Sequence, residues 1–121
     1  MTDLLITLTQ KEDNANNVTV AFTMGKMALS KGHSVSLILL SNAVHLAERG
    51  YGNKIDIGEP FQPVGELISE FIAQGGEIKV CSACMKHNGV SEDNLMEDVE
   101  IITAEDVISI IMDSKKSLQL N

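Results

Sequence analysis

The sequence predicts a single α/β domain, residues 1–121, built on a mainly parallel sheet. Short aliphatic runs at residues 4–8 and 35–40 indicate buried strands, because they are too short for typical helices and are bounded by turn-forming residues. Between them, apolar residues recur at helical spacing from Asn17 to about Gly32. This strand–helix–strand order predicts a parallel crossover, and a length of 121 residues suits one domain.

The first half of the chain also contains two predicted loops. Residues 9–16 form a polar loop after the first strand, and Asn16 or Asn17 is available to cap the helix that follows. His33, just after that helix, is expected to satisfy its last carbonyls. Residues 44–48 indicate a short helical turn, and residues 49–61 indicate an irregular loop that could act as a lid or a contact surface.

A second helix and a third strand follow. Pro63 suits the first position of an amphipathic helix that closes at Gly75 and Gly76. Residues 78–81 then form a short strand, so Cys81 is expected where this strand ends and the next turn or helix begins.

The last part of the chain predicts one more strand and one more helix. Val99–Ile102 is the fourth strand, and Thr103 with Asp106 has the spacing of a capping box. The helix after it is apolar around much of its circumference, so it is either buried on two sides or part of a subunit interface. Residues 117–121 are either a fraying tail or a short fifth strand.

Composition and charge exclude several classes of partner. The 17 Asp and Glu residues outnumber the 9 Lys and Arg residues, and the net charge of -8 repels nucleic-acid phosphates and anionic membranes. No apolar stretch approaches the length of a membrane-spanning helix, and no signal-peptide pattern is present, so we expect a cytoplasmic protein. Glycine-rich nucleotide motifs are absent, and no cofactor is expected.

Cys81 and Cys84 are the main candidates for chemistry, because the thiolate is the reactive form of cysteine and the two residues lie at C-x-x-C spacing. Ligands of open parallel sheets bind beside the carboxyl ends of strands, where Cys81 is expected. Lys79, Lys86 and His87 lie nearby in the sequence. With the positive end of a helix starting directly after Cys81, they would favour a thiolate or persulfide anion.

Other polar residues are weaker candidates. Asn14, in the loop after the first strand, could supply polar contacts, and His45 lies near the carboxyl end of the second strand and could face the same crevice. An acidic run without Lys or Arg is either a solvated face or a docking patch for a basic partner. It comprises Glu92, Asp93, Glu97, Asp98, Glu100, Glu105 and Asp106.

Several interpretations of the cysteine pair are open. Either cysteine could be a small buried apolar side chain. A structural zinc site usually needs four ligands, and only His87 with a distant His33 or His45 could complete one, so no metal is expected unless subunits share a site. A thioredoxin-like dithiol follows a first strand, whereas this pair follows the third. Sulfur relay through one or both thiols fits the placement best.

The chain resembles the DsrE/DsrF-like family, which includes the TusD-type subunits of sulfur-relay complexes. The resemblance rests on the polar loop at residues 10–16, the Lys-Gly-His at 31–33, the strand at 35–40, the glycine pair at 75–76 and the segment at 80–90. It implies a three-layer α/β/α sandwich with a mainly parallel sheet of four to five strands. It also implies homo- or hetero-oligomers, often trimers or hexamers, with cysteines near subunit contacts.

The resemblance also suggests which cysteine carries sulfur. In sulfur-transferring members, the persulfide cysteine follows a strand at the head of a short helix that ends in Gly-Val or Gly-Ile. Counting back from Gly89 and Val90, that position is Cys81, whereas other members have a cysteine at the place of Cys84. This chain has Cys-Met-Lys-His at 84–87 instead of an alanine-rich helix with arginine. The resemblance therefore indicates the fold and the assembly of this chain more strongly than its reaction.

The resulting hypothesis is a sulfur carrier or sulfurtransferase that works with donor and acceptor proteins. Cys81 accepts sulfane sulfur as a persulfide, and Cys84 receives that sulfur or resolves the persulfide as a disulfide. Lys79, Lys86 and His87 stabilise the anion. The alternatives are a non-enzymatic oligomeric binding module whose cysteines only pack, and a thiol–disulfide redox protein.

Overall fold

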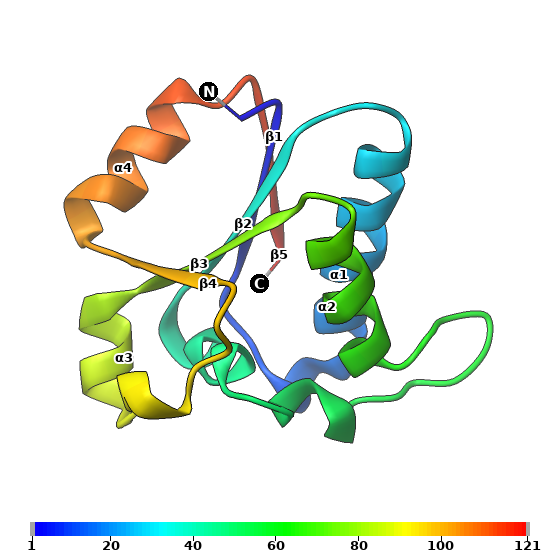
Figure 1. Cartoon of the computed structure of the whole chain (residues 1–121), viewed down its shortest axis with the longest axis horizontal. Coiled ribbons are helices and arrows are strands. Elements are labelled where there is room, and N and C mark those ends of the chain that lie inside the picture. The colour runs from blue at the N-terminus through cyan, green and yellow to red at the C-terminus, as the bar shows by residue number, and fades with distance from the viewer. Residues whose placement is uncertain (1, 121) are drawn as a thin grey trace.

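Five strands form one parallel sheet in the spatial order β4-β3-β2-β1-β5 (Figure 1). The computed structural model describes residues 2–120. Its strands are β1 Leu4–Leu8, β2 Val35–Leu39, β3 Glu77–Cys81, β4 Val99–Ile102 and β5 Lys116–Leu120. Every neighbouring pair is parallel, which confirms the predicted sheet.

The last strand decides between the two predictions for residues 117–121. β5 pairs with β1 along its whole length, with Leu4 opposite Lys116 and Leu8 opposite Leu120. Leu118 and Leu120 pack against the main core, as a strand would and a fraying tail would not. Asn121, the end of the predicted segment, lies outside the described residues.

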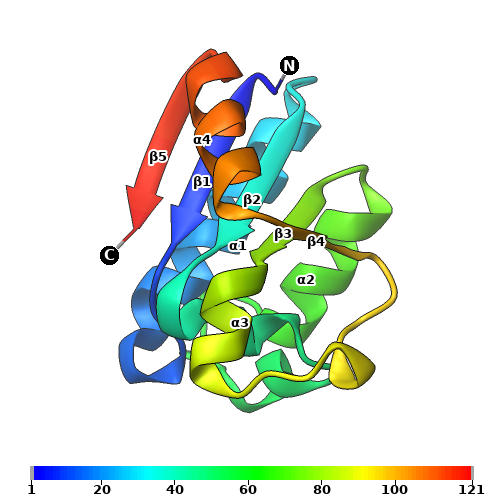
Figure 2. The same ribbon diagram turned by 90° about the vertical axis from the view of Figure 1, so that its left-hand side faces the viewer.

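Helices cover both faces of this sheet. α1 (Ala15–Ser30) and α2 (Val64–Ala73) lie on one face, while α3 (Ser82–Asn88) and α4 (Ala104–Asp113) lie on the other, as Figures 1 and 2 show. The three-layer α/β/α arrangement is therefore confirmed.

Alternate residues of the strands supply two apolar clusters, one on each face of the sheet, because successive side chains in a strand point in opposite directions. The larger cluster lies beneath α1 and α2, where the rings of Phe22 and Phe71 meet edge to face with centroids 5.9 Å apart. The smaller cluster consists of Leu5, Ile38, Cys81, Ile102 and Val107.

The start of α1 differs from the prediction. A 3₁₀ helix at Glu12–Asn14 runs directly into α1, so the helix begins at Ala15. The N-cap is Asn14, whose side chain accepts a hydrogen bond from the Asn17 N–H at 3.2 Å. The prediction of Asn16 or Asn17 as the cap was wrong, because several nearby asparagines could all act as caps and only the preceding turn selects one.

The segment between β2 and α2 holds more helix than the sequence indicated. Two 3₁₀ helices, Ser41–Ala47 and Tyr51–Lys54, occupy the predicted turn and the first part of the predicted loop. Pro63 is the N-cap of α2, one position before its predicted place. A lid or contact role for the remaining loop stays a prediction.

α4 is the helix that is least covered by the rest of the chain. It begins with the predicted capping box, in which Thr103 and Asp106 exchange side-chain and backbone hydrogen bonds. Val107 faces the sheet, but Ile108 is 60% exposed and Met112 is 76% exposed. The helix is therefore not buried on two sides within one chain.

No helix within residues 2–120 is both long enough and apolar enough to cross a membrane.

Candidate dithiol site

The candidate site lies at the carboxyl edge of the sheet, where β3 passes into α3. Cys81 is the last residue of β3 and the N-cap of α3, and Cys84 follows one helical turn later. Because all strands are parallel, the residues that follow β1 and β2 reach the same edge. The sequence-based placement of both cysteines beside this edge is correct.

The two thiols differ in accessibility. Both are free, but Cys81 is only 5% exposed and packs in the smaller apolar cluster, whereas Cys84 is partly exposed. Cys81 lies close enough to Cys84 to raise the pKa of the Cys84 thiol. The pair therefore has one thiol that an incoming molecule can reach and one beneath it.

Cys84 also contacts the start of the neighbouring 3₁₀ helix. The backbone N–H of Ser41 lies near the Cys84 sulfur and acts to lower the pKa of that thiol. Burial raises the pKa of the Cys84 thiol, the Ser41 N–H opposes this shift, and the adjacent Cys81 adds to it, so the net pKa is above the ordinary value. At Cys84, burial therefore outweighs the one stabilising donor, and the stabilised anion that the sequence predicts at Cys81 stays a prediction.

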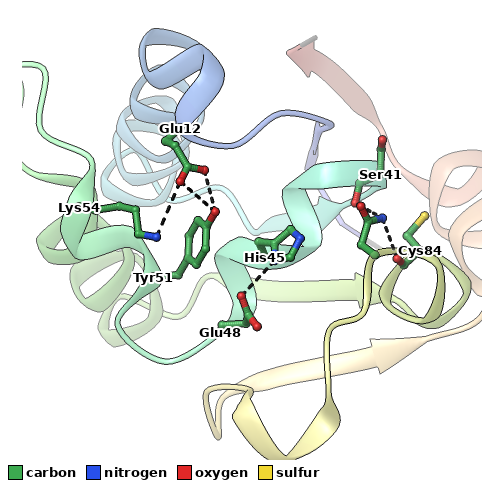
Figure 3. A network of polar contacts seen from close by, with 8 residues as sticks. Glu12, Ser41, His45, Glu48, Tyr51, Lys54 and Cys84 are labelled. Atoms are coloured by element: carbon green, nitrogen blue, oxygen red, sulfur yellow. Dashed lines mark hydrogen bonds and ion pairs between the residues drawn. The ribbon is translucent and has the colours of Figure 1, made fainter.

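Asn88 connects these two segments. Its side-chain Nδ2 donates to the Cys84 carbonyl oxygen at 2.8 Å and to the Ser41 carbonyl oxygen at 3.3 Å. Figure 3 shows Ser41 and Cys84 side by side with these hydrogen bonds. Sequence reasoning missed Ser41 and Asn88, although the i,i+4 spacing from Cys84 to Asn88 was an available signal.

Lys79 is engaged elsewhere. Its ammonium lies 2.5 Å from a Glu100 carboxylate oxygen and 3.5 Å from one of Glu77. Burial lowers the pKa of Lys79, but hydrogen bonding and attraction to Glu100 and Glu77 outweigh burial, so the pKa is raised. The two carboxylates thus neutralise the cation that the sequence assigned to the sulfur anion.

Lys86 and His87 lie in the last turn of α3, and both side chains are exposed. Lys86 lines an open hollow of about 570 Å³ together with Ser82, Met85 and Glu92. Neither cysteine is among the residues that line this hollow. A role for Lys86 and His87 beside the sulfur stays a prediction.

His45 belongs to a separate polar network at the same edge (Figure 3). Its Nδ1 lies 3.1 Å from a Glu48 carboxylate oxygen, and its ring stacks on Tyr51 with centroids 5.6 Å apart. The Tyr51 hydroxyl donates to both Glu12 carboxylate oxygens at 2.7 and 3.0 Å, and the Lys54 ammonium lies 3.9 Å from the centre of the Tyr51 ring.

This network joins the loop after β1 to the segment after β2. Burial, followed by the hydrogen bond to Glu12, raises the pKa of Tyr51 well above its usual range, and the same hydrogen bond lowers the pKa of Glu12. A neutral tyrosine and an ionised glutamate are the stable pair.

Asn14 uses its side chain to cap α1 and to donate to the Gln10 side-chain oxygen at 2.8 Å.

Within the part of the chain that the structure describes, no three His, Cys, Asp or Glu side chains are grouped so that they could hold a metal ion.

The fold and the site together define an α/β protein with a dithiol at the carboxyl edge of a parallel sheet. Comparison with known proteins assigns the chain more closely. It belongs to the DsrE/DsrF-like family, whose sequence profile matches residues 3–120. Family membership suggests a role in sulfur relay in general terms.

Individual relatives support the family and the fold. An uncharacterized protein of Methanopyrus kandleri is 32% identical over 87 residues, which cover 72% of this chain and 68% of the relative. The crystal structure of the ychN protein from E. coli superposes with a TM-score of 0.73 at 23% identity, covering 98% of this chain and 99% of that one. A protein of unknown function from Methanobacterium thermoautotrophicum gives 0.70 at 13% identity, covering 96% of each chain.

Proposed function

We propose that this protein is a sulfur carrier or sulfurtransferase that holds sulfane sulfur as a cysteine persulfide. The observation that carries the proposal is the pair of neighbouring free thiols with one reachable member, Cys84, at the carboxyl edge of the sheet. Counting along the family's pattern favours Cys81 as the carrier. The accessibility of the two thiols instead favours Cys84 as the first acceptor, with Cys81 as the second thiol.

The proposed transfer is a thiol–persulfide exchange. The Cys84 thiolate attacks the outer sulfur of a donor persulfide, a new S–S bond forms at Cys84, the donor's S–S bond breaks, and the donor leaves as a thiolate. An acceptor thiolate then removes the sulfane sulfur by the same exchange, and the electron pair of the broken bond returns to Cys84.

Cys81 gives the loaded protein a second outcome. When no acceptor is present, the Cys81 thiolate can attack the Cys84 sulfur, so that a Cys81–Cys84 disulfide forms and hydrosulfide leaves. An external dithiol would then reduce this disulfide. The closeness of the two thiols, one helical turn apart at the start of α3, supports this reaction.

Mass spectrometry of the protein after incubation with glutathione persulfide tests the proposal. We expect an added mass of about 32 Da, one sulfur atom, on the peptide that contains both cysteines. Fragmentation should locate the sulfur on Cys84, and treatment with dithiothreitol should remove it. Absence of the adduct from Cys81→Ser, which has no second thiol to expel hydrosulfide, with this donor, with polysulfide and with a cysteine desulfurase would overturn the proposal.

A thiol–disulfide redox protein is the second candidate, because the same contact between thiols suits a reversible disulfide. Equilibration with glutathione buffers separates the two candidates. A reduction potential in the range of known oxidoreductases, about -120 to -270 mV, combined with no sulfur adduct, would favour redox chemistry.

We also propose that the chain forms a homo-oligomer through α4. Ile108 and Met112 stand four residues apart on the exposed side of this helix, beside the partly exposed Ile111. An outward apolar stripe on a helix suits packing against the same stripe of a second copy. A trimer or hexamer is the expected order, and a cytoplasmic location likewise stays a prediction.

Charge on the α4 stripe should dissociate this oligomer. We expect light scattering to give the Ile108→Glu, Met112→Glu variant the 13.1 kDa mass of one chain. The unaltered protein should have a multiple of that mass. Met24→Glu, which alters an exposed methionine on α1, is the matched control and should leave the oligomer intact. An unaltered protein that is monomeric would contradict the proposal.

A further inference from the structure

Ser41 has an unusual backbone conformation beside the dithiol. Its φ is 55°, and it is the one non-glycine residue within 2–120 that has a positive φ. This left-handed conformation is disfavoured for any residue with a Cβ atom, because Cβ approaches the neighbouring carbonyl oxygen. Such a residue persists only when its surroundings hold it, and it is often found at functional sites.

The conformation accompanies a specific contact. Ser41 is the first residue of the 3₁₀ helix after β2, and its N–H reaches the Cys84 sulfur. Its side chain is exposed, so burial of the serine does not account for the strained backbone. The conformation instead directs one backbone N–H donor, that of Ser41, toward the Cys84 sulfur.

Asn88 is placed to hold this arrangement. It is the last residue of α3, and Gly89, with a φ of 72°, ends the helix immediately after it. The Asn88 amide nitrogen has two N–H donors, and the two carbonyl oxygens it reaches belong to Ser41 and Cys84. The Asn88 side chain therefore links Ser41, which supplies the N–H donor, to Cys84, which supplies the sulfur.

We infer that Asn88 is a positioning residue that holds the Ser41 backbone N–H against the Cys84 sulfur. Its functional meaning rests on the proposed sulfur transfer. In loading, Cys84 attacks as a thiolate. In unloading, the S–S bond breaks and its electron pair stays on the Cys84 sulfur. Negative charge lies on the same atom in both steps, and a donor fixed in advance stabilises it without reorganisation.

The test is the pH profile of Cys84 alkylation by iodoacetamide, resolved from Cys81 by fragmentation of the modified peptide. Without Asn88 the Ser41 N–H is no longer fixed, so the thiolate loses its donor and its population at neutral pH falls. We expect Asn88→Ala to slow the alkylation of Cys84 by about three- to ten-fold near pH 7, the worth of one hydrogen bond. The rates of the two proteins should converge once the thiol is fully ionised.

Two further variants make the result specific. Asn42→Ala alters the exposed asparagine next to Ser41 and should leave the profile unchanged. Ser41→Gly removes the steric penalty of the left-handed backbone, so the effect of Asn88→Ala should be smaller in that background. If Asn88→Ala alone fails to fold, the double variant, compared with Ser41→Gly, supplies the measurement.

An unshifted profile for Asn88→Ala, or a rate lowered by the same factor at every pH, would overturn the inference. A uniform change would mean altered access to Cys84 and not altered ionisation. The alkylation readout does not require sulfur transfer. A shifted profile in a protein that never accepts sulfane sulfur would therefore refute the proposed function alone, and normal loading with an unshifted profile would refute the role of Asn88 alone.

Discussion

Cys84→Ser should reduce persulfide loading to background, whereas Cys81→Ser should still load. The reason is access, because Cys81 is 5% exposed beneath the partly exposed Cys84. A serine hydroxyl is not a sulfur nucleophile, so the buried thiol would have to meet the donor directly. The measurement is the fraction of each variant that gains one sulfur from glutathione persulfide, determined by intact-protein mass spectrometry.

The fate of the loaded sulfur distinguishes the two cysteines further. Cys81→Ser should keep its persulfide longer than the unaltered protein, because no second thiol is present to expel hydrosulfide. The unaltered protein should instead accumulate a disulfide that is two hydrogen masses lighter, about 2 Da. Loading that survives in Cys84→Ser and disappears in Cys81→Ser would reverse the order and restore Cys81 as the first acceptor.

Phe71→Ala is expected to lower the free energy of unfolding by about 3–5 kcal/mol. The Phe71 ring is fully buried and meets Phe22 edge to face. Two glycines fit closely around it: a Cβ at Gly76 would lie 2.5 Å from the ring, and one at Gly25 would lie 2.7 Å from it. Neither glycine has a side chain that could move into the resulting cavity, so the lost contacts are not recovered.

This loss is large against the total stability of a domain, which is about 5–15 kcal/mol. Urea denaturation followed by far-UV circular dichroism measures it. Phe61→Ala is the control, because Phe61 lies in the loop before α2 and is only partly buried, and we expect that variant to lose about 1 kcal/mol or less. An equal loss of unfolding free energy in both variants would contradict the prediction that the buried Phe71 ring contributes more to stability than the Phe61 ring.

The strands were predictable from the sequence because their aliphatic runs are short and clearly bounded. Val99–Ile102 was predicted with both bounds correct, and β2 and β3 each differ from the prediction by one residue. The sequence does not decide on β5, because the alternation of Leu118 and Leu120 is compatible with both a short strand and a fraying tail. Only its pairing with β1, which is remote in sequence, makes it a strand.

The candidate site was predictable in location but not in its partners. Cys81 could be placed at a strand end because the aliphatic run stops there. The ion-pair partner of Lys79 could not be predicted, because it depends on the register that puts Glu100 opposite it on β4. The left-handed backbone of Ser41 is likewise a tertiary feature, imposed by contacts across 47 residues of sequence.

The place of β5 has a consequence for synthesis of the chain. β1 is the first strand to be made, yet one of its two neighbours is the last, so its β5-facing side has no partner while the intervening residues are translated. That open side carries an apolar strand containing Leu5, Ile6 and Leu8, which is the kind of edge that recruits strands from other molecules. Chaperone protection of the nascent chain should therefore matter most before residues 116–120 emerge from the ribosome.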